Sequence, residues 1–316
     1  MSHKQPNIIR SLDENKDIEQ FVENVLQIHD EEEAKKAIRL ILNAEIMRGV
    51  RQKAPTNKYK TFRTKAYRGD KEREQLRKEI VMELKNLTRL ENDEDIKLGK
   101  GGAKPRSDVQ NNRLIYYIIG LPASGKSGIA SRIADLVGAY IVDSDLAKRK
   151  FVESGEQPDG SSLVHEESDE IVFSREPILG EDSLFMYCIK NGINMVIPKI
   201  GSSIDGIDDI CKVLQNNGYS VYLISVDLSR EKATQRAYQR YKKTGRYVPL
   251  GLIFDQYANE PILCYFRIVQ REQKKKKKDR LFSGFAQYST DTLKDGEVIL
   301  IEERNMQDIV SRMRKE

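Results

Sequence analysis

Residues 120–127 read Gly-Leu-Pro-Ala-Ser-Gly-Lys-Ser, and this segment constrains the fold more than any other part of the chain. It matches the pattern G-x-x-x-x-G-K-S/T, which cradles phosphate groups where a strand passes into a helix. An apolar run at residues 114–119 precedes it, and Ile129, Ile133 and Leu136 follow with helical spacing. We therefore expect a strand, a phosphate-binding loop and a helix, in that order.

The residue types of this loop suit a nucleoside triphosphate. Gly120 and Gly125 permit backbone conformations that turn consecutive N–H groups toward phosphate oxygens. Lys126 is expected to reach the β- and γ-phosphates, and the Ser127 hydroxyl to ligate Mg²⁺. The alternative, an ordinary glycine-rich turn, is disfavoured by the flanking pattern. ATP or GTP and Mg²⁺ are the expected ligands, and the predicted nucleotide-binding residues are Gly120, Ala123, Ser124, Gly125, Lys126, Ser127 and Gly128.

Short apolar runs alternate with helical patterns in the C-terminal two thirds of the chain. Strands that alternate with helices predict an α/β fold with a parallel sheet covered on both faces. The expected strands lie at residues 114–119, 139–142, 193–200, 219–227 and 297–301.

The N-terminal part has a different pattern. Its apolar residues recur with helical spacing near residues 18–26, 31–48 and 70–87, so residues 1–90 are expected to form a small all-helical domain with a regulatory or substrate-binding role. Residues 91–112 lack apolar periodicity and are rich in glycine, which is typical of a linker. Residues 113–316 would then form the nucleotide-binding domain.

Composition excludes several classes of protein. No run of about 18 apolar residues exists and no apolar segment opens the chain, so we expect a cytoplasmic protein without a membrane contact. The three cysteines, Cys188, Cys211 and Cys264, lack C-x-x-C spacing, which excludes a disulfide framework or a structural zinc site as the organising principle.

Two carboxylates follow the second expected strand. Asp143 and Asp145 lie where that strand would reach its carboxyl end, the edge that faces the nucleotide in open α/β sheets. Phosphoryl transfer needs a carboxylate to orient the acceptor hydroxyl or to accept its proton. Asp145 is the candidate base, and Asp143 is the candidate for the metal shell. The alternative for both is that they cap the following helix.

A basic helix and turn occupy residues 230–249. Arg236 and Arg240 are four residues apart and share one helix face, and Arg246 follows a helix-breaking Gly245. Guanidinium groups suit the charge of a transferring phosphoryl group. The alternative is a solvated basic face.

The order of these segments resembles the zeta-toxin family of P-loop kinases. The segments that carry the resemblance lie within residues 113–260 and read GLPASGKS, VDSDLAKRK, LVHEESDEI, NGINMVI and RAYQRYKKTGRYVP. The resemblance implies a P-loop NTPase kinase core with a five-stranded, mainly parallel sheet. It also implies transfer of a γ-phosphate to a hydroxyl of a small molecule, most often a UDP-N-acetylsugar, by a toxin that an antitoxin can hold in check.

The resemblance also implies roles for single residues. Lys126, Asp145, Arg240 and Arg246 match the catalytic positions, and His165, Glu166 and Glu167 fall in the segment near the acceptor. The start of an amphipathic helix is the alternative for that last segment. The chain departs from the family on the acceptor side, where a carboxylate is missing after the strand at 193–200 and Lys199 is present.

Residues 48–68 support a different hypothesis. They carry eight basic residues and no acid, with aromatic residues interleaved, as in proteins that bind single-stranded nucleic acid. One alternative function is therefore a nucleic-acid-binding protein or a polynucleotide-type kinase. The other interpretation is that this stretch packs across the cleft and inhibits the enzyme. The lysine run at residues 274–278 is expected to be a solvated loop. If residues 48–68 inhibit the enzyme, a chain that starts near Ser107 is expected to keep the whole P-loop domain and to hydrolyse or transfer phosphate at least as fast as the full chain.

Overall fold

The computed structural model describes residue 12 and residues 14–156, 159–292, 297–306 and 309. Its centre is one sheet with the strand order β2-β3-β1-β4-β5-β6. The first five strands run parallel, and β6 pairs antiparallel with β5 at the edge. The strands are β1 (Leu114–Gly120), β2 (Tyr140–Ile141), β3 (Met195–Lys199), β4 (Ser220–Asp227), β5 (Gly284–Ser289) and β6 (Ile299–Arg304).

The expected α/β fold with a mainly parallel sheet is confirmed, but the described sheet has six strands where five were expected. The strand that sequence analysis missed is β5, which reads GFAQYS and lacks a continuous apolar run. Gly284 opens it because a Cβ there would lie 2.4 Å from the carbonyl oxygen of Asn305, next to β6. The expected strand at 297–301 is the antiparallel edge strand β6.

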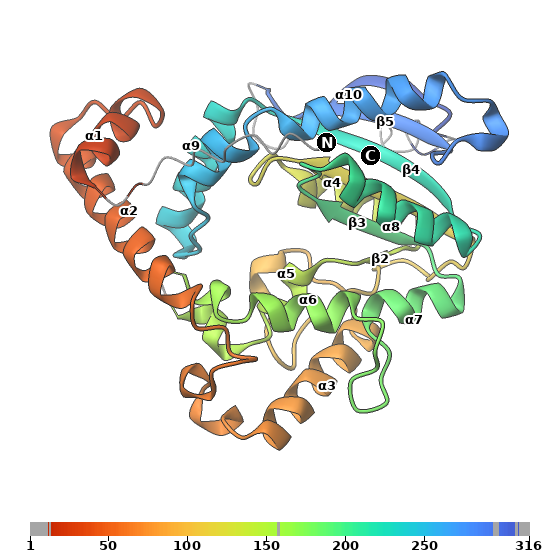
Figure 1. The fold of residues 1–316 in the computed structure, drawn as a ribbon, viewed down its shortest axis with the longest axis horizontal. Coiled ribbons are helices and arrows are strands. Elements are labelled where there is room, and N and C mark those ends of the chain that lie inside the picture. Colours follow the sequence, from red (N-terminus) through yellow and green to blue (C-terminus); the bar gives the residue numbers. More distant parts are fainter. Residues whose placement is uncertain (1–11, 13, 157–158, 293–296, 307–308, 310–316) are drawn as a thin grey trace, which may run out of the picture.

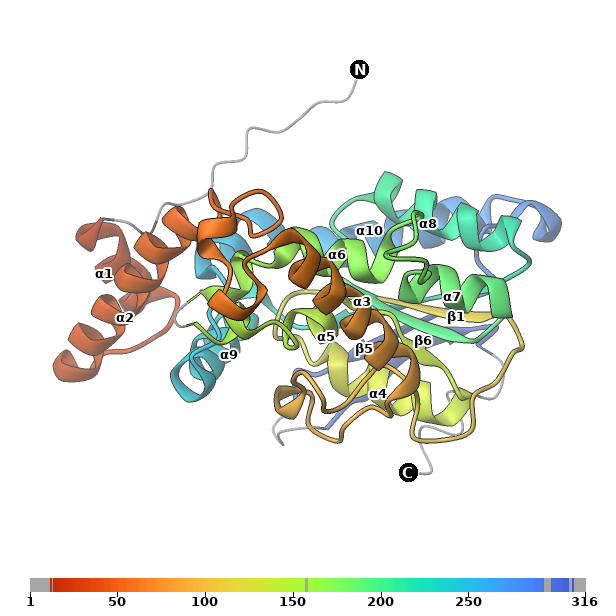
Figure 2. The same cartoon turned by 90° about the horizontal axis from the view of Figure 1, so that it is seen from below.

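Helices cover both faces of the sheet. Figure 2 shows α4 (Lys126–Val137) on one face and α8 (Ile204–Asn216) with α10 (Glu260–Gln273) on the other. The sheet interior is therefore buried on both sides, and β1 is buried at every position after its first residue. This double cover explains why β1, β3 and β4 read as apolar runs in the sequence.

Helices α5 (Ser144–Lys148), α6 (His165–Phe173) and α9 (Arg230–Thr244) lie near the carboxyl ends of the strands. On one side, α5 packs against α6, and α6 packs against α7 (Leu184–Asn191). On the other side, α9 is followed by a π-helical turn at Leu252–Tyr257. Figure 1 shows α9 to the left of the strands and the α5–α6 pair below the sheet.

The first helices divide between two places on the rest of the chain. Helices α1 (Asn15–Asn24) and α2 (Glu31–Arg51) share an apolar cluster with α9, to which Phe21, Ile41 and Tyr238 contribute. Helix α3 (Asp70–Asn86) instead joins the main core and contacts α6. Residues 1–90 were expected to form a unit of their own, but their helices complete the packing of the C-terminal part.

Residues 91–112 were expected to be a linker, and the structure packs them along the core. Ile96 and Ala103 are buried, and the Ala103 carbonyl accepts a hydrogen bond from the Ile141 N–H at 3.1 Å. The Gln110 N–H donates to the Gly138 carbonyl at 2.9 Å. The glycines of this segment permit its tight turns. The sequence pattern alone suggests a flexible linker, because it does not reveal the contacts of the segment with the core.

Candidate active site

The phosphate-binding loop lies between β1 and α4, as the sequence predicts. A Cβ at Gly120 would lie 2.5 Å from the Val226 carbonyl oxygen of the neighbouring strand, so only glycine fits there. Gly125 has φ of 87° and starts α4 from the left-handed region, which glycine adopts without strain. The amino end of α4 therefore opens toward the loop, where backbone N–H groups and the helix dipole favour an anion.

Lys126 rests inside this loop. Its Nζ donates to the carbonyl oxygens of Gly120 at 2.7 Å and Leu121 at 2.5 Å. Burial lowers the pKa of its ammonium to about 7, an effect larger than the opposing attraction of Asp143. A bound phosphate supplies stronger acceptors than two carbonyls, so the side chain is placed to change partners when an anion enters.

The two aspartates after β2 have different surroundings. The Asp143 carboxylate caps α5 by accepting the Asp145 N–H at 3.0 Å, so it makes the cap that was its alternative role. Burial, together with the neighbouring Asp145, raises the pKa of Asp143. Asp145 accepts Lys148 at 3.0 Å and also Arg246. Burial raises the pKa of Asp145, but Lys148 and Arg246 outweigh it and hold that pKa well below its usual range.

The three arginines of the basic segment reach the cleft by different contacts. Arg246 bridges Asp145 and Glu94, whose carboxylate lies 3.2 Å from the guanidinium. Burial lowers the pKa of Arg240 to about 10, with Arg246 adding to the effect, and its Nε is buried without a hydrogen-bond partner among the described residues. An unpaired guanidinium N–H in a cleft is suited to an anionic ligand.

Arg236 is tied to the phosphate-binding loop through Thr290, which follows β5. The guanidinium donates to the Thr290 hydroxyl at 3.2 Å and to its carbonyl at 2.8 Å. The same hydroxyl donates to the Ser124 carbonyl of the loop at 2.7 Å. Thr290 was not found from the sequence because β5, which positions it, was not predicted.

The side of the cleft that α5 and α6 form, called the acceptor wall from here on, differs from the expectation. His165 lines the cleft, but Glu166 and Glu167 are not among its lining residues. Glu166 is exposed and bonds to Asn57, whereas Glu167 is 1% exposed and binds Arg73. Their place is structural, because Glu166 and Glu167 fix α6 to the N-terminal segment.

Asp169 takes the position on the acceptor wall that the sequence argument gave to the glutamates. It lines the cleft, accepts the Ser144 hydroxyl and lies 3.8 Å from His165 Nε2. The signal that could have found it is the spacing of four residues from His165, which places both side chains on one helix face.

One cleft of about 1000 Å³ is lined by the charged and titratable groups Lys126, Asp143, Asp145, His165, Asp169, Arg236, Arg240 and Arg246. The loop and α9 form one side of it, and α5 and α6 form the other. Helix α2 adds Arg48 and Gln52, which sequence analysis did not assign to the site. Tyr247 also lines the cleft, and its hydroxyl donates to Glu45 of α2 at 2.5 Å. The volume is enough for a nucleotide and a second small molecule.

The cleft contains both residues that were expected to hold a divalent metal. Ser127 and Asp143 both line the cleft and offer a hydroxyl and a carboxylate, the oxygen donors that Mg²⁺ prefers beside nucleotide phosphates. In the ranges that the structure describes, no group of three or more histidine, cysteine, aspartate and glutamate side chains could hold a metal by itself. This donor set therefore suits Mg²⁺ that a nucleotide helps to bind.

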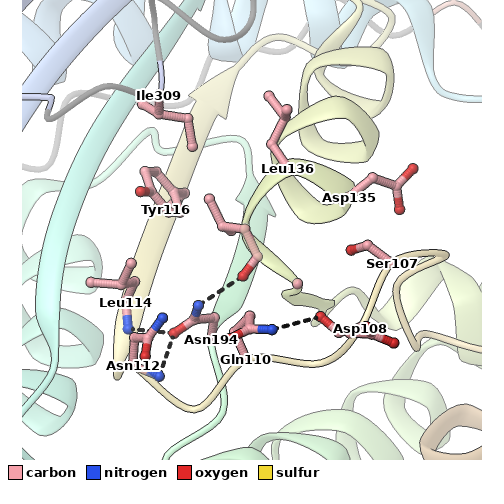
Figure 3. A pocket seen from close by; sticks show the side chains of 12 residues that line it. Ser107, Asp108, Gln110, Asn112, Leu114, Tyr116, Asp135, Leu136, Asn194 and Ile309 are labelled. Carbon is pink, nitrogen blue, oxygen red and sulfur yellow. Dashed lines mark hydrogen bonds between the residues drawn. The ribbon is translucent and has the colours of Figure 1, made fainter.

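A second cavity, of about 610 Å³, lies at the opposite edge of the sheet (Figure 3). It is lined by the start of β1 and by the segment before β3, where Asn194 bonds to the Leu114 N–H and the Val137 carbonyl. None of the predicted catalytic residues lies there. The predicted catalytic residues instead line the cleft at the carboxyl ends of the strands.

Several basic side chains of residues 48–68 are buried or form ion pairs within the protein. Arg51 and Arg63 are buried, and Arg63 pairs with Asp70 at 3.0 Å. Lys58 pairs with Glu166 of α6 at 3.0 Å. These contacts place the stretch against the acceptor wall, where part of it is not available to a polyanion.

No helix in the described residues is long and apolar enough to cross a membrane.

The family model that matches the chain is that of the zeta toxin, over residues 101–277. One similar solved structure belongs to the PezAT chromosomal toxin-antitoxin system of Streptococcus pneumoniae, with 14% identity, coverage of 66% of this chain and 79% of that chain, and a TM-score of 0.46. The AvrRxo1-ORF1:AvrRxo1-ORF2 complex with sulphate ions has 18% identity, 76% and 72% coverage and a TM-score of 0.45. The same complex with ATP has 18% identity, 72% and 64% coverage and a TM-score of 0.41. No curated protein matches the chain.

Proposed function

The chain belongs to the zeta toxin family of P-loop kinases, and on this premise we propose that it moves the γ-phosphate of ATP or GTP to a hydroxyl of a small molecule. The proposed acceptor is a UDP-N-acetylsugar or a related nucleotide metabolite, and the proposed consequence is toxicity. One observation carries the proposal: Lys126, Asp145, Arg240 and Arg246 line the same cleft from three different elements.

The first proposed step is binding of the nucleotide. The β- and γ-phosphates occupy the loop and draw Lys126 away from the carbonyls of Gly120 and Leu121. The anion favours the charged form of this lysine, so binding raises the pKa that burial lowers. Ser127 and Asp143 would hold Mg²⁺, which would neutralise part of the phosphate charge.

The second proposed step frees the base. Arg246 holds the Asp145 carboxylate in the structure, and this pairing makes Asp145 a weak proton acceptor. When phosphates enter, Arg246 turns to them together with Arg240, because both guanidinium groups line the cleft. Asp145 then accepts the hydrogen bond of the acceptor hydroxyl and takes its proton as the oxygen attacks the γ-phosphate.

The N-terminal segment is proposed to restrain this reaction. Helix α2 places Arg48 and Gln52 at the cleft, and Glu45 of the same helix binds Tyr247 beside Arg246. A segment so placed narrows the entrance for the acceptor. A separate antitoxin protein that binds the same face is the alternative form of restraint.

The function is tested by incubating the full chain with labelled ATP or GTP, Mg²⁺ and a metabolite extract, followed by mass spectrometry of phosphorylated products. The wild-type chain should yield a new phosphomonoester, and Lys126→Ala should lose it because the variant lacks the cation at the transferring phosphate. Lys190→Ala, on α7 and outside the cleft, is the matched control. A Lys126 variant that transfers phosphate normally would refute the kinase mechanism.

A further inference from the structure

The proposed transfer leaves one cation of the cleft without a role. Lys199 is the last residue of β3 and lines the cleft beside Lys148 and His165. In the part of the chain that the structure describes, Lys148 pairs with Asp145, but no carboxylate lies within ion-pair distance of Lys199. Removing an ammonium group partly from water costs free energy, and no ion pair offsets that cost at Lys199. The contacts that Lys199 makes instead are therefore informative.

The ammonium of Lys199 rests on an aromatic ring. Its Nζ lies 3.9 Å from the centroid of the Phe173 ring on α6. The ring face attracts the charge but accepts none of the three N–H donors in a conventional hydrogen bond. The nearby Asp169 is already engaged by Ser144 and His165. Lys199 therefore has donors to offer to a ligand in the cleft.

The sheet places Lys199 between the phosphate-binding loop and the segment that carries the candidate base Asp145. Strand β3 lies between β2, which leads to Asp145, and β1, which leads to the phosphate-binding loop. Lys199 pairs with Ile119 of β1 in the sheet register, yet its ammonium leans on α6. Helix α6 is the wall that also carries His165 and Asp169. The position of the charge is thus on the acceptor side of the loop.

We propose that Lys199 determines acceptor specificity by binding a phosphate or diphosphate group that the acceptor carries close to its reacting hydroxyl. This inference rests on the proposed phosphotransferase function. The nucleotide already has Lys126, Arg240 and Arg246 for its own phosphates. A compact ammonium supplies point-charge recognition of a further phosphate, where an acid at this position would repel it.

The test fills the nucleotide site first, so that any further phosphate binding reports on the proposed acceptor site at Lys199. The full chain is saturated with Mg²⁺ and a non-hydrolysable ATP analogue, and inorganic pyrophosphate is then titrated by calorimetry with Mg²⁺ in excess. The variants are Lys199→Met, which keeps the length of the side chain without its charge, and Lys199→Arg, which keeps the charge. Lys190→Met is the control, because Lys190 pairs with Asp182 on α7 away from the cleft. Thermal unfolding of each variant verifies the fold.

We expect pyrophosphate to bind the loaded wild-type chain and the Lys190 variant equally. Lys199→Met should weaken it by about tenfold or more, and Lys199→Arg should retain most of the affinity. Pyrophosphate that fails to bind the loaded protein, or that binds the methionine variant as well as the wild type, overturns the proposal. If Lys199→Met instead weakens the ATP analogue, the lysine serves the donor nucleotide, which also overturns it.

Nucleotide turnover distinguishes this failure from failure of the proposed function. A wild-type chain that neither hydrolyses nor transfers phosphate from ATP or GTP refutes the phosphotransferase. The pyrophosphate titration needs no turnover, so its outcome for Lys199 stands independently.

Discussion

Asp143 and Asp145 are two residues apart, and the structure gives them opposite electrostatic settings. Asp143 is half-buried, caps a helix and has a raised pKa, whereas Asp145 faces Lys148 and Arg246 and has a lowered pKa. Their residue type alone could not assign their roles. The surrounding cations indicate that Asp145 is ionised at neutral pH and ready to orient a hydroxyl.

Asp145→Asn is expected to lower kcat by about 10²–10⁴ while leaving nucleotide affinity within a few fold, because the amide keeps the size of the side chain but accepts no proton. Single-turnover transfer and calorimetric nucleotide binding measure the two effects. Asp143→Asn is the comparison variant, and it should weaken Mg²⁺-nucleotide binding instead. Equal losses of kcat in both variants would contradict this assignment.

Asp159 makes the stability of the protein depend on pH. Burial raises its pKa to about 6, against the opposing bond from Ser162 and the charge of Arg48. A raised carboxyl pKa means that the native state prefers the protonated form. The native state therefore loses stability as the pH rises from about 4 to 6, and the loss then levels off.

Asp159→Asn should therefore stabilise the protein more at pH 7.5 than at pH 4.5, by about 2 kcal/mol of difference. Urea unfolding of the wild type and the variant at both pH values measures the difference. Asp205→Asn, on the exposed start of α8, is the control and should show no such pH dependence. A variant whose effect is the same at both pH values would show that Asp159 does not titrate in this window.

The end of β5 couples two elements that the sequence keeps far apart. Thr290 binds both the Ser124 carbonyl of the phosphate-binding loop and Arg236 of α9. Thr290 therefore links α9 directly to the loop. Its methyl group lies close to Gly125, where a Cβ would meet it at 3.0 Å.

Thr290→Val keeps the shape of the side chain and removes the hydroxyl. It should raise the KM for the nucleotide several-fold and lower kcat, because the loop carbonyl and Arg236 both lose a partner. Thr290→Ser restores the hydroxyl without the methyl group and should recover most of the activity. Steady-state kinetics of both variants are the measurement, and a serine variant as impaired as the valine variant would show that packing, and not the hydroxyl, matters.

Helix α2 can be loosened without touching the catalytic residues. Ala44 is fully buried in the cluster that α2 shares with α9. Ala44→Asp should detach the helix locally, because an unpaired carboxylate is costly to bury. If α2 restrains the cleft, nucleotide turnover should rise several-fold and proteolysis near α2 should quicken.

Lys36→Asp, on the exposed face of the same helix, is the control. Falling turnover in a folded Ala44 variant would mean that α2 helps to build the site.

In the molecule as a whole, one buried guanidinium joins the N-terminal segment to the acceptor wall. Arg73 of α3 is 2% exposed and binds Glu153 and Glu167, which are 0% and 1% exposed. The Thr56 hydroxyl completes this group by donating to Glu167 at 2.8 Å. Two buried carboxylates thus depend on one arginine that lies outside the matched family region at residues 101–277.

Arg73→Met should destabilise the chain by about 3–5 kcal/mol, because it leaves both carboxylates buried without their cation. Arg77→Met removes a partly exposed pair with Glu170 and should cost about 1 kcal/mol or less. Urea unfolding measures both.

Because it lacks Arg73, a chain that starts at Ser107 should fail to fold stably, although it contains the whole phosphate-binding loop. A soluble, cooperative unfolding transition of that shorter chain would contradict the role given to Arg73.

The sequence predicted what depends on local pattern and missed what depends on pairing across the molecule. The loop at residues 120–127, the flanking strand and the helix follow from glycine positions and apolar spacing, and the structure has them. Strand β5 lacks an apolar run and forms because β4 and β6 flank it. Glu167 and Asp169 show the same limit within one helix, because the buried partner of Glu167 is Arg73, which lies 94 residues away and whose position the local pattern does not reveal.

The order of Arg73, Glu153 and Glu167 along the chain has a consequence for how the protein is made. Translation delivers the N-terminal end first, at about 5–20 residues per second. Helices α2 and α3 have therefore left the ribosome before the acceptor wall that they support is synthesised. A cell that makes this protein never holds a completed cleft without its N-terminal partner, and the two are always present in equal numbers. Dilution, uneven expression or faster degradation of one partner, which can unbalance two separate proteins, cannot separate these two.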